Sequence, residues 1–520
     1  MKSIFEKIVG KDSIVSDPIK LQELAEASYK KQTTFSLALY PKNEKEIQEI
    51  MKEARRLSLK VHPISCGKNT GYGSKSPYQD KTILLDLSRM NKILNFNENL
   101  GYVTVQPGVT FEQLFLFLRE NKSNLRASCT SGHYLSSVLA NALERGNGAG
   151  HYGERSEFLA GIVAILGTGE IIRTGLSSFE GAESAPVYRQ GPGVSLLDSF
   201  FKTNFGIVTQ ATIWLMPLFN YQEIIHFYIN RVEKLASISD ALHELRFRSC
   251  IYELDIGISN RERMQQLMKM AFLEWPIDHT PVAIPDTPDF PHEWGIHISF
   301  FAESKEQLKA NSALCKKFLK SKADAVQSIC RERKEIEALI KYNYSMKKKT
   351  QKGKAPFFPF NVEVLSLGVP STKMEGCYCQ KKEIISSEPN PEKDRCGVML
   401  LKAPVPFLGS LIQEVASLCT EILQKWNFEP IIGFIQVKER TVDLIVNLIY
   451  DREIEGEDEK ADVCFKECIQ RLCERGIIPT RLPRGFYEFL PKRNDDSQHL
   501  LMRMKALFDP DKVIDPERYL

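Results

Sequence analysis

A glycine-rich segment near the start of the chain has the residue types that bind a phosphate group. Residues 63–73 read Pro-Ile-Ser-Cys-Gly-Lys-Asn-Thr-Gly-Tyr-Gly and lie between two short apolar segments that predict strands. Glycines allow backbone N–H groups to converge on phosphate oxygens, and Ser65, Lys68 and Asn69 add side-chain donors. The glycine spacing differs from the Rossmann fingerprint, and a strand rather than a helix follows. We therefore predict an anion-binding loop of a different type.

Three later segments extend this pattern. Residues 88–108 read Ser-Arg-Met-Asn-Lys-Ile-Leu-Asn-Phe-Asn-Glu-Asn-Leu-Gly-Tyr-Val-Thr-Val-Gln-Pro-Gly, and residues 137–153 read Ser-Val-Leu-Ala-Asn-Ala-Leu-Glu-Arg-Gly-Asn-Gly-Ala-Gly-His-Tyr-Gly. Residues 205–217 read Phe-Gly-Ile-Val-Thr-Gln-Ala-Thr-Ile-Trp-Leu-Met-Pro. In this order, the four segments resemble the FAD-binding domain of the vanillyl-alcohol oxidase and para-cresol methylhydroxylase family. The resemblance is dense over residues 36–217 and returns near residues 476–520.

The resemblance implies an α+β fold, in which a two-part FAD-binding domain of the PCMH type receives an inserted α+β cap domain built on an antiparallel sheet. We expect residues 1–217 to form the FAD-binding domain, residues 218–475 the cap or substrate domain, and residues 476–520 a C-terminal return that completes the FAD-binding domain. The residues themselves support a change of domain, because glycine becomes rarer and strand and helix patterns alternate after Asn220. A chain of 520 residues is also longer than one core normally serves.

Within the middle region, we expect long loops at residues 276–293 and 343–358. The acidic run at residues 451–462 is expected to form a turn that precedes a helix from Val463 to Arg475.

The resemblance also assigns residues to the cofactor FAD. At the pyrophosphate we expect Ser65, Cys66, Gly67, Lys68, Asn69 and Gly71. The second glycine-rich strip supplies Ser137, Asn141, Glu144, Arg145, Gly146 and Gly153. Backbone groups of three consecutive residues are expected near the adenosine or the ring edge: Ile207, Val208 and Thr209. Simple turn formation explains any one of these glycines but explains the whole set poorly.

Two residues are the first candidates for catalysis. A flavin accepts the hydride itself, at N5, so the protein must position the substrate and stabilise the charge that develops. Arg481 matches a family arginine at the active site, and the resemblance implies that it stabilises the anionic reduced ring. Tyr72 matches a family tyrosine that holds a substrate phenolate. The alternatives are an arginine that pairs with a surface carboxylate and a tyrosine whose ring only packs on the flavin or on the turn.

Two positions near this site depart from the family pattern. Phenol-oxidising relatives place an aspartate near the flavin N5, but this sequence has Gly132 there and no carboxylate within reach. His133 is the candidate base or polariser in its place, and the alternative is an ordinary loop histidine. The tyrosine that precedes the active-site arginine in relatives is Thr480 here. The two changes weaken the expectation of a 4-alkylphenol substrate.

The attachment of the flavin is a separate question. Some relatives bind the flavin covalently through a histidine, and the matching position here is Val398 or a neighbour, in a segment without histidine. A non-covalent FAD is therefore expected. Cys129 lies where other members of the superfamily attach the flavin through a thiolate, although an ordinary buried thiol is the default. Cys66 occupies a loop position that is often arginine in relatives.

The bulk composition excludes several classes of partner. A net charge of +3 gives no electrostatic reason to expect nucleic acid or an anionic membrane. No uncharged run approaches the ~18 residues that span a bilayer, and the N-terminus does not read as a secretory signal. The 12 cysteines have no regular spacing, which favours intracellular thiols, no structural metal and a cytoplasmic location.

From these features we predict an FAD-dependent oxidoreductase that acts on a small organic substrate, either an alcohol or a phenol-related compound. Its electrons would pass to dioxygen or to another acceptor. One alternative keeps the FAD but acts on a non-phenolic hydroxy acid or a sugar. A second alternative is a flavin-binding interaction protein that has lost catalysis. Relatives often form dimers or larger assemblies, so a homo-oligomer is a further expectation, although nothing in the sequence fixes the number of subunits.

Overall fold

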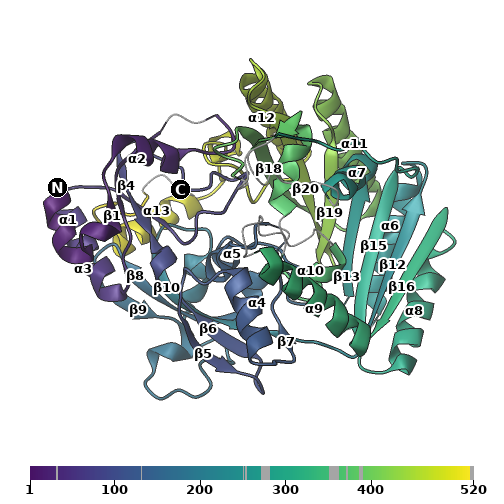
Figure 1. Ribbon diagram of the computed structural model, residues 1–520, viewed down its shortest axis with the longest axis horizontal. Helices are drawn as coiled ribbons and strands as arrows, with labels where there is room; N and C mark the ends of the chain where they lie inside the picture. The colour runs from purple at the N-terminus through teal and green to yellow at the C-terminus, as the bar shows by residue number, and fades with distance from the viewer. Residues whose placement is uncertain are drawn as a thin grey trace.

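The computed structural model describes residues 1–30, 33–130, 132–249, 251, 254–270, 281–350, 362–370, 373–385 and 390–515. Figure 1 shows two groups of elements: the N-terminal strands and helices on the left, and a large sheet flanked by helices on the right. The last helix, α13 (Ser497–Phe508), lies within the left-hand group. The chain therefore returns to its N-terminal part after it has built the large sheet.

The first sheet of the left-hand group has the strand order β1-β2-β4-β3. Strands β2, β4 and β3 run parallel, and every residue of β4 is buried, as expected for a strand covered on both faces. Helix α3 connects β2 to β3 and begins after Asn43, whose side chain accepts a hydrogen bond from the Glu46 N–H. The bounds are α1 (Lys2–Val9), β1 (Ile14–Val15), α2 (Pro18–Ala25), β2 (Phe35–Leu39), α3 (Glu44–Arg56), β3 (Val61–Ile64) and β4 (Thr82–Asp86).

The second sheet is antiparallel, with the order β5-β6-β10-β8-β9. The short helix α5 follows Ser137, whose hydroxyl accepts a hydrogen bond from the Ala140 N–H and so fixes where the helix begins. The bounds are β5 (Ile93–Asn97), β6 (Tyr102–Val105), α4 (Phe111–Glu120), β7 (Leu125–Arg126), α5 (Val138–Leu143), β8 (Leu159–Leu166), β9 (Ile171–Arg173), β10 (Gly206–Trp214) and β11 (Met216–Pro217).

The large sheet has seven antiparallel strands in the order β16-β12-β15-β13-β19-β20-β18. Alternate residues such as Phe227, Ile256 and Leu401 face the helices α6, α8, α11 and α12 in one apolar cluster. The strands are β12 (Tyr221–Ile229), β13 (Leu254–Asn260), β15 (Trp294–Ala302), β16 (Ala325–Glu332), β18 (Cys396–Pro406), β19 (Ile431–Lys438) and β20 (Thr441–Asp451). The helices of this part are α6 (Lys234–Arg248), α7 (Arg261–Met270), α8 (Lys305–Leu319), α9 (Arg333–Thr350), α10 (Val362–Leu365), α11 (Gly409–Lys425) and α12 (Glu457–Glu474), and β14 (Val282–Ala283) pairs with β17 (Glu383–Ile384).

The expected α+β fold, with an antiparallel sheet as its largest element, is confirmed. Two local expectations are wrong. Helix α9 continues through Thr350, where a loop was expected from residue 343, while residues 351–358 lie outside the described residues. Helix α12 begins at Glu457 rather than at Val463, because three acidic residues in its first turn favour a helix N-terminus.

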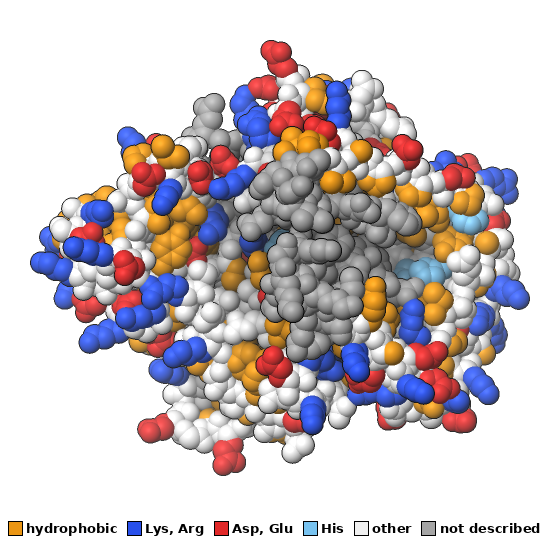
Figure 2. All heavy atoms as spheres, viewed as in Figure 1, with side chains coloured by type: hydrophobic (Ala, Val, Ile, Leu, Met, Phe, Trp, Pro, Cys, Tyr) orange, Lys and Arg blue, Asp and Glu red, His pale blue; other side chains and the backbone are white. Residues whose placement is uncertain are grey.

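The face of the molecule seen in Figure 2 carries charges of both signs. On the face seen in Figure 2, Lys and Arg side chains alternate with Asp and Glu side chains around the rim of the molecule. Among the described helices, none is both long and apolar enough to span a bilayer. The same part of the chain holds no cluster of three or more His, Cys, Asp or Glu side chains that is placed to bind a metal ion.

Candidate functional site

A cavity with about 1070 Å³ of empty volume, including its part open to solvent, lies at the glycine-rich loop. Five separated parts of the chain form its wall: the end of β3 with the loop after it, Leu87 after β4, helix α5 with its flanking residues, the segment that leads into β10, and the C-terminal return. The fold therefore assembles in one place segments that are up to 450 residues apart, from Ser65 to Asp515.

Most of the predicted cofactor residues line this cavity. They are Ser65, Cys66, Gly67, Lys68, Asn69, Ser137, Asn141, Glu144, Ile207 and Val208. The loop turns sharply because Gly67, Gly71 and Gly73 have φ angles of 63°, 82° and 118°, which side chains with a Cβ rarely adopt.

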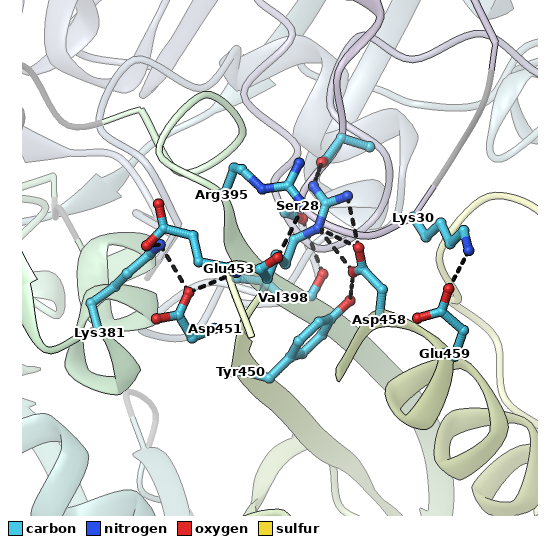
Figure 3. A network of polar contacts seen from close by, with 12 residues as sticks. Ser28, Lys30, Lys381, Arg395, Val398, Tyr450, Asp451, Glu453, Asp458 and Glu459 are labelled. Atoms are coloured by element: carbon cyan, nitrogen blue, oxygen red, sulfur yellow. Dashed lines mark hydrogen bonds and ion pairs between the residues drawn. The ribbon is translucent and has the colours of Figure 1, made fainter. Parts of the chain in front are cut away.

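Gly71 and Thr209 are not part of the cavity wall. The Gly71 N–H donates to Ser28 Oγ (3.0 Å), and a Cβ at this position would lie 2.5 Å from Leu400 of β18. Ser28 in turn exchanges hydrogen bonds with both backbone groups of Val398, at 2.7 and 3.0 Å (Figure 3). Gly71 is therefore placed to hold the loop against the large sheet. Thr209 Oγ1 donates to Glu44 on α3 (2.6 Å).

Three residues of the second glycine-rich strip also lie outside the wall and support it. The Gly146 Cα lies so close to Asn141 that a Cβ would be 2.0 Å from its Oδ1. The Gly153 carbonyl accepts a hydrogen bond from the Gly148 N–H (2.9 Å). Arg145 has a φ angle of 49°, and its carbonyl accepts a hydrogen bond from Lys402 Nζ (3.1 Å). These positions shape the turn that follows α5.

Arg481 and Tyr72, the two main catalytic candidates, lie against each other. The Arg481 guanidinium carbon is 4.1 Å from the centre of the Tyr72 ring, and its Nη2 donates to Asn69 Oδ1 (2.9 Å). Arg481 lines the cavity and is only 9% exposed, and its buried Nε has no hydrogen-bond partner among the described residues. Burial raises the pKa of Tyr72, while Arg481 lowers it. Tyr72 therefore stays a hydroxyl donor at neutral pH.

A buried polar cluster supports this pair from the large sheet. Lys402 of β18 exchanges backbone hydrogen bonds with Arg481, and its ammonium pairs with Asp443 of β20 (2.8 Å). Asn147, from the turn after α5, donates to the same carboxylate (2.6 Å) and accepts from Lys402. The cluster fixes the segment that carries Arg481. It was not predicted, because no sequence spacing relates Asn147, Lys402 and Asp443.

Lys202 is a further cation of the cavity wall that the sequence did not indicate. Its ammonium donates to the Thr480 carbonyl and to the Tyr487 hydroxyl (3.2 Å). Burial, together with the neighbouring cations Arg481, Lys402 and Arg145, lowers the pKa of Lys202 to about 7, although Glu144 opposes this. Thr480, the position where relatives have a tyrosine, thus accepts a hydrogen bond from Lys202 through its backbone carbonyl.

His133 is buried and does not line the cavity. Burial, with a contribution from Lys68, lowers its pKa to about 3, so the imidazole is neutral at physiological pH. Its Nδ1 accepts a hydrogen bond from the Leu135 N–H (3.0 Å), which leaves the proton on Nε2. In this state His133 is a hydrogen-bond donor through Nε2 rather than a base.

The two candidate cysteines are thiols with little tendency to ionise. Cys129 is 1% exposed, its Sγ donates to the Gly368 carbonyl (3.1 Å), and burial raises its pKa to about 12. Cys66 lines the cavity, and burial raises its pKa to about 12 as well. A thiolate is the form that attacks a flavin ring, so neither side chain is prepared for covalent attachment.

The donor set of the cavity fits FAD. The loop offers backbone N–H groups and Lys68 to a pyrophosphate, and the buried Asn204 Oδ1, which has no partner among the described residues, is an acceptor for an adenosine amine or hydroxyl. Arg481 supplies a fixed cation for a ring that becomes anionic on reduction. Asn204, Lys202 and Arg484 were missed because single polar residues in these segments carry no recognisable spacing.

Comparisons with known proteins agree with this cavity. Residues 35–175 match the FAD binding domain family. The chain is 29% identical to the 1'-carboxy-chondrochloren decarboxylase of Chondromyces crocatus, over 99% of this chain and 96% of that protein. It is 25% identical to the flavoprotein subunit of 4-cresol dehydrogenase [hydroxylating] from Pseudomonas putida, over 91% of this chain and 85% of that protein.

Solved structures show the same fold. A crystal structure of p-cresol methylhydroxylase with substrate bound superposes with a TM-score of 0.82 at 22% identity, and covers 99% of this chain and 95% of that one. The 4-ethylphenol oxidase of Gulosibacter chungangensis gives a TM-score of 0.81 at 20% identity, with the same coverage. The predicted PCMH-type fold and the predicted cofactor, FAD, are thereby confirmed. The chain therefore carries an FAD binding domain over residues 35–175, and it has the fold expected from its resemblance to the vanillyl-alcohol oxidase and para-cresol methylhydroxylase family of FAD-linked oxidoreductases.

Proposed function

We propose that this enzyme oxidises a small phenol-related substrate at a C–H bond, with a non-covalently held FAD as the hydride acceptor and dioxygen or another compound as the final acceptor. The observation that carries the proposal is the contact of Arg481 with Tyr72 at 4.1 Å beside the cofactor cavity. The two relatives that match over nearly the whole chain act, by their names, on a cresol and on a carboxy-chondrochloren.

The two side chains suit a substrate that carries an oxyanion. The Tyr72 hydroxyl stays protonated and donates a hydrogen bond, and Arg481 has a buried Nε without a partner among the described residues. A guanidinium that is buried without a carboxylate is stabilised by an anionic ligand. In this proposal Tyr72 and Arg481 orient the substrate, and Arg481 also stabilises the charge that develops on the reduced cofactor.

A second candidate reaction is an oxidation coupled to the loss of a carboxylate. The relative named as a decarboxylase is 29% identical over 99% of this chain. Arginine binds carboxylates through two parallel hydrogen bonds, and Arg481 makes one side-chain hydrogen bond, to Asn69 Oδ1, among the described residues. The same cation is therefore able to hold a substrate carboxylate.

The test is anaerobic reduction of the FAD-loaded protein, followed in the visible spectrum, with four substrates in parallel. They are a 4-alkylphenol, a 4-hydroxyphenyl compound with a carboxylate on its side chain, D-lactate and a sugar. Bleaching by either phenol supports the proposal, and release of CO₂ with the second phenol selects the decarboxylating reaction. Bleaching only by D-lactate or by the sugar would replace the proposed substrate class. Reduction by dithionite, but by none of the four, would contradict it.

A further inference from the structure

Arg484, in the C-terminal return, is a buried cation that the proposed reaction does not use. It is 6% exposed and lines the cavity together with Ser65, Lys68 and Asn69. Its Nη2 makes a long hydrogen bond to the Ser74 carbonyl (3.4 Å), and its Nη1 is buried without a partner among the described residues.

The position of the guanidinium is fixed by its surroundings. The Arg484 N–H donates to Tyr29 Oη (2.9 Å), and the guanidinium carbon lies 5.3 Å from the centre of the Tyr78 ring. Gly73 allows this approach, because a Cβ there would be 2.8 Å from Arg484 Cδ. The side chain is thus preorganised at the end of the glycine-rich loop.

Among the described residues, Arg484 forms no ion pair with a carboxylate, although Glu144 and Asp515 line the same cavity. The nearby Lys75 differs, because it pairs with Asp86 at 2.8 Å. A buried guanidinium that lacks an anionic partner is unfavourable unless a ligand supplies the negative charge. In the loop itself, Lys68 is the one cationic side chain that lines the cavity, whereas a pyrophosphate carries two negative charges.

We infer that Arg484 binds a phosphate group of FAD, so that the C-terminal return contributes a cation to the anion site formed by the loop at residues 65–69. The assignment concerns cofactor binding and is independent of which substrate is oxidised. It also gives the buried arginine a role. The glycines already set the conformation of the loop, so the loop does not need Arg484 for its shape. The competing role is purely structural, in which Arg484 only fastens the Ser74 backbone.

Three ligands separate the two roles. The apoproteins of the wild type, R484M and R484K are titrated calorimetrically with FAD, with ADP and with riboflavin, which has no phosphate. R475M is the matched control, because Arg475 lies in the same part of the chain and is exposed, paired with Glu414 at 2.9 Å.

A lost charge-assisted contact predicts that R484M weakens FAD and ADP binding about 10- to 100-fold. Riboflavin affinity is expected to be unchanged, and R484K is expected to be intermediate.

Two results would overturn the inference. FAD and ADP affinities that stay at the wild-type value in R484M would show that the guanidinium contacts no phosphate. An equal loss for ADP and riboflavin would show that Arg484 only shapes the loop. If R484M does not fold, R484K decides between the roles by the same comparison of ADP with riboflavin. Substrate oxidation does not enter any of these measurements.

Discussion

Arg481 is the residue on which most of the proposed chemistry depends. Its guanidinium contacts Tyr72 and Asn69, and it is held by the backbone of Lys402. Removing one preorganised charge-stabilising group typically lowers kcat about 10²- to 10³-fold. We expect R481M to slow anaerobic FAD reduction by the best substrate to this extent, and R481K to recover part of the rate.

The control for this prediction is R475M, which changes an exposed arginine that does not line the cavity. Stopped-flow absorbance measures the reduction rate, and far-UV circular dichroism checks that each variant is folded. An R481M rate within threefold of the wild type would remove Arg481 from the proposed reaction.

Lys202 predicts a pH dependence of stability in the apoprotein. Its pKa is lowered to about 7 in the fold, mainly by burial, and is ~10.4 in an unfolded chain. Between these values the unfolded chain binds the additional proton, so this group makes the free energy of unfolding rise with pH. We expect K202M to lack this rise, so that the wild type gains stability relative to K202M from pH 6.5 to pH 9.

Urea denaturation of both apoproteins at the two pH values measures the difference. Other titrating groups contribute equally to both proteins, so the comparison isolates Lys202. Parallel pH profiles would contradict the lowered pKa.

At the scale of elements, the contact between the large sheet and the turn after α5 depends on the buried Lys402–Asp443 pair, at 8% and 5% side-chain exposure. Removing one partner of such a pair leaves a buried charge and costs about 3–5 kcal/mol. We expect D443N to lose about this much free energy of unfolding. The double change K402M/D443L is expected to recover most of it, because apolar side chains can replace the pair.

The matched control is D462N, since Asp462 pairs with Lys466 on the exposed face of α12 at 2.7 Å. Exposed pairs contribute about 0–1 kcal/mol, so D462N is expected to change little. The midpoint of urea denaturation measures all three variants. A D443N midpoint equal to that of D462N would contradict the proposed role of the cluster.

The elements themselves could largely be predicted from the sequence. The strand from Trp294 and the helix from Lys305 to Leu319 lie where alternation and helical spacing indicate them. The start of α12 differs from the prediction because an acidic run is typical of a turn but also favours the first turn of a helix. The periodicity of apolar residues indicates where a helix or strand lies. The exact residue at which it begins or ends depends on whether the flanking residues favour a turn or a further helical turn.

The candidate site was only partly predictable, for a physical reason. The loop residues from Ser65 to Asn69 are contiguous and belong to a glycine-rich turn, so their role in anion binding could be predicted from the sequence. Lys202, Asn204 and Arg484 come from segments that meet the loop only after folding. Tyr72 and Arg481 were found through the family resemblance, and their contact at 4.1 Å could not have been derived from spacing.

At the scale of the whole molecule, the C-terminal return forms part of the cavity wall. Ile514 pairs with Val61 of the first sheet, and the buried Asp509 accepts hydrogen bonds from Lys505 Nζ (2.7 Å) and from the Ile514 N–H (2.8 Å). Because Ile514 and Asp515 line the cavity, we expect D509A to weaken FAD binding at least tenfold and to speed proteolysis of the return.

D511A is the control, since Asp511 lies in the same segment but pairs with Arg55 at half-exposed positions. Limited proteolysis with mass spectrometry locates the cleavage, and calorimetry gives the FAD affinity. If D509A behaves like D511A in both measurements, the return does not control the cavity.

The measurement that tests the central claim most directly is the visible spectrum of the purified protein, repeated on supernatant and pellet after acid precipitation. The account predicts a flavin spectrum whose absorbance moves entirely to the supernatant, because the proposed FAD is held without a covalent bond. Colour retained in the pellet would contradict non-covalent binding and direct attention to Cys129 despite its buried thiol. A protein without a flavin spectrum, which also fails to bind added FAD, would contradict the assignment of the cavity itself.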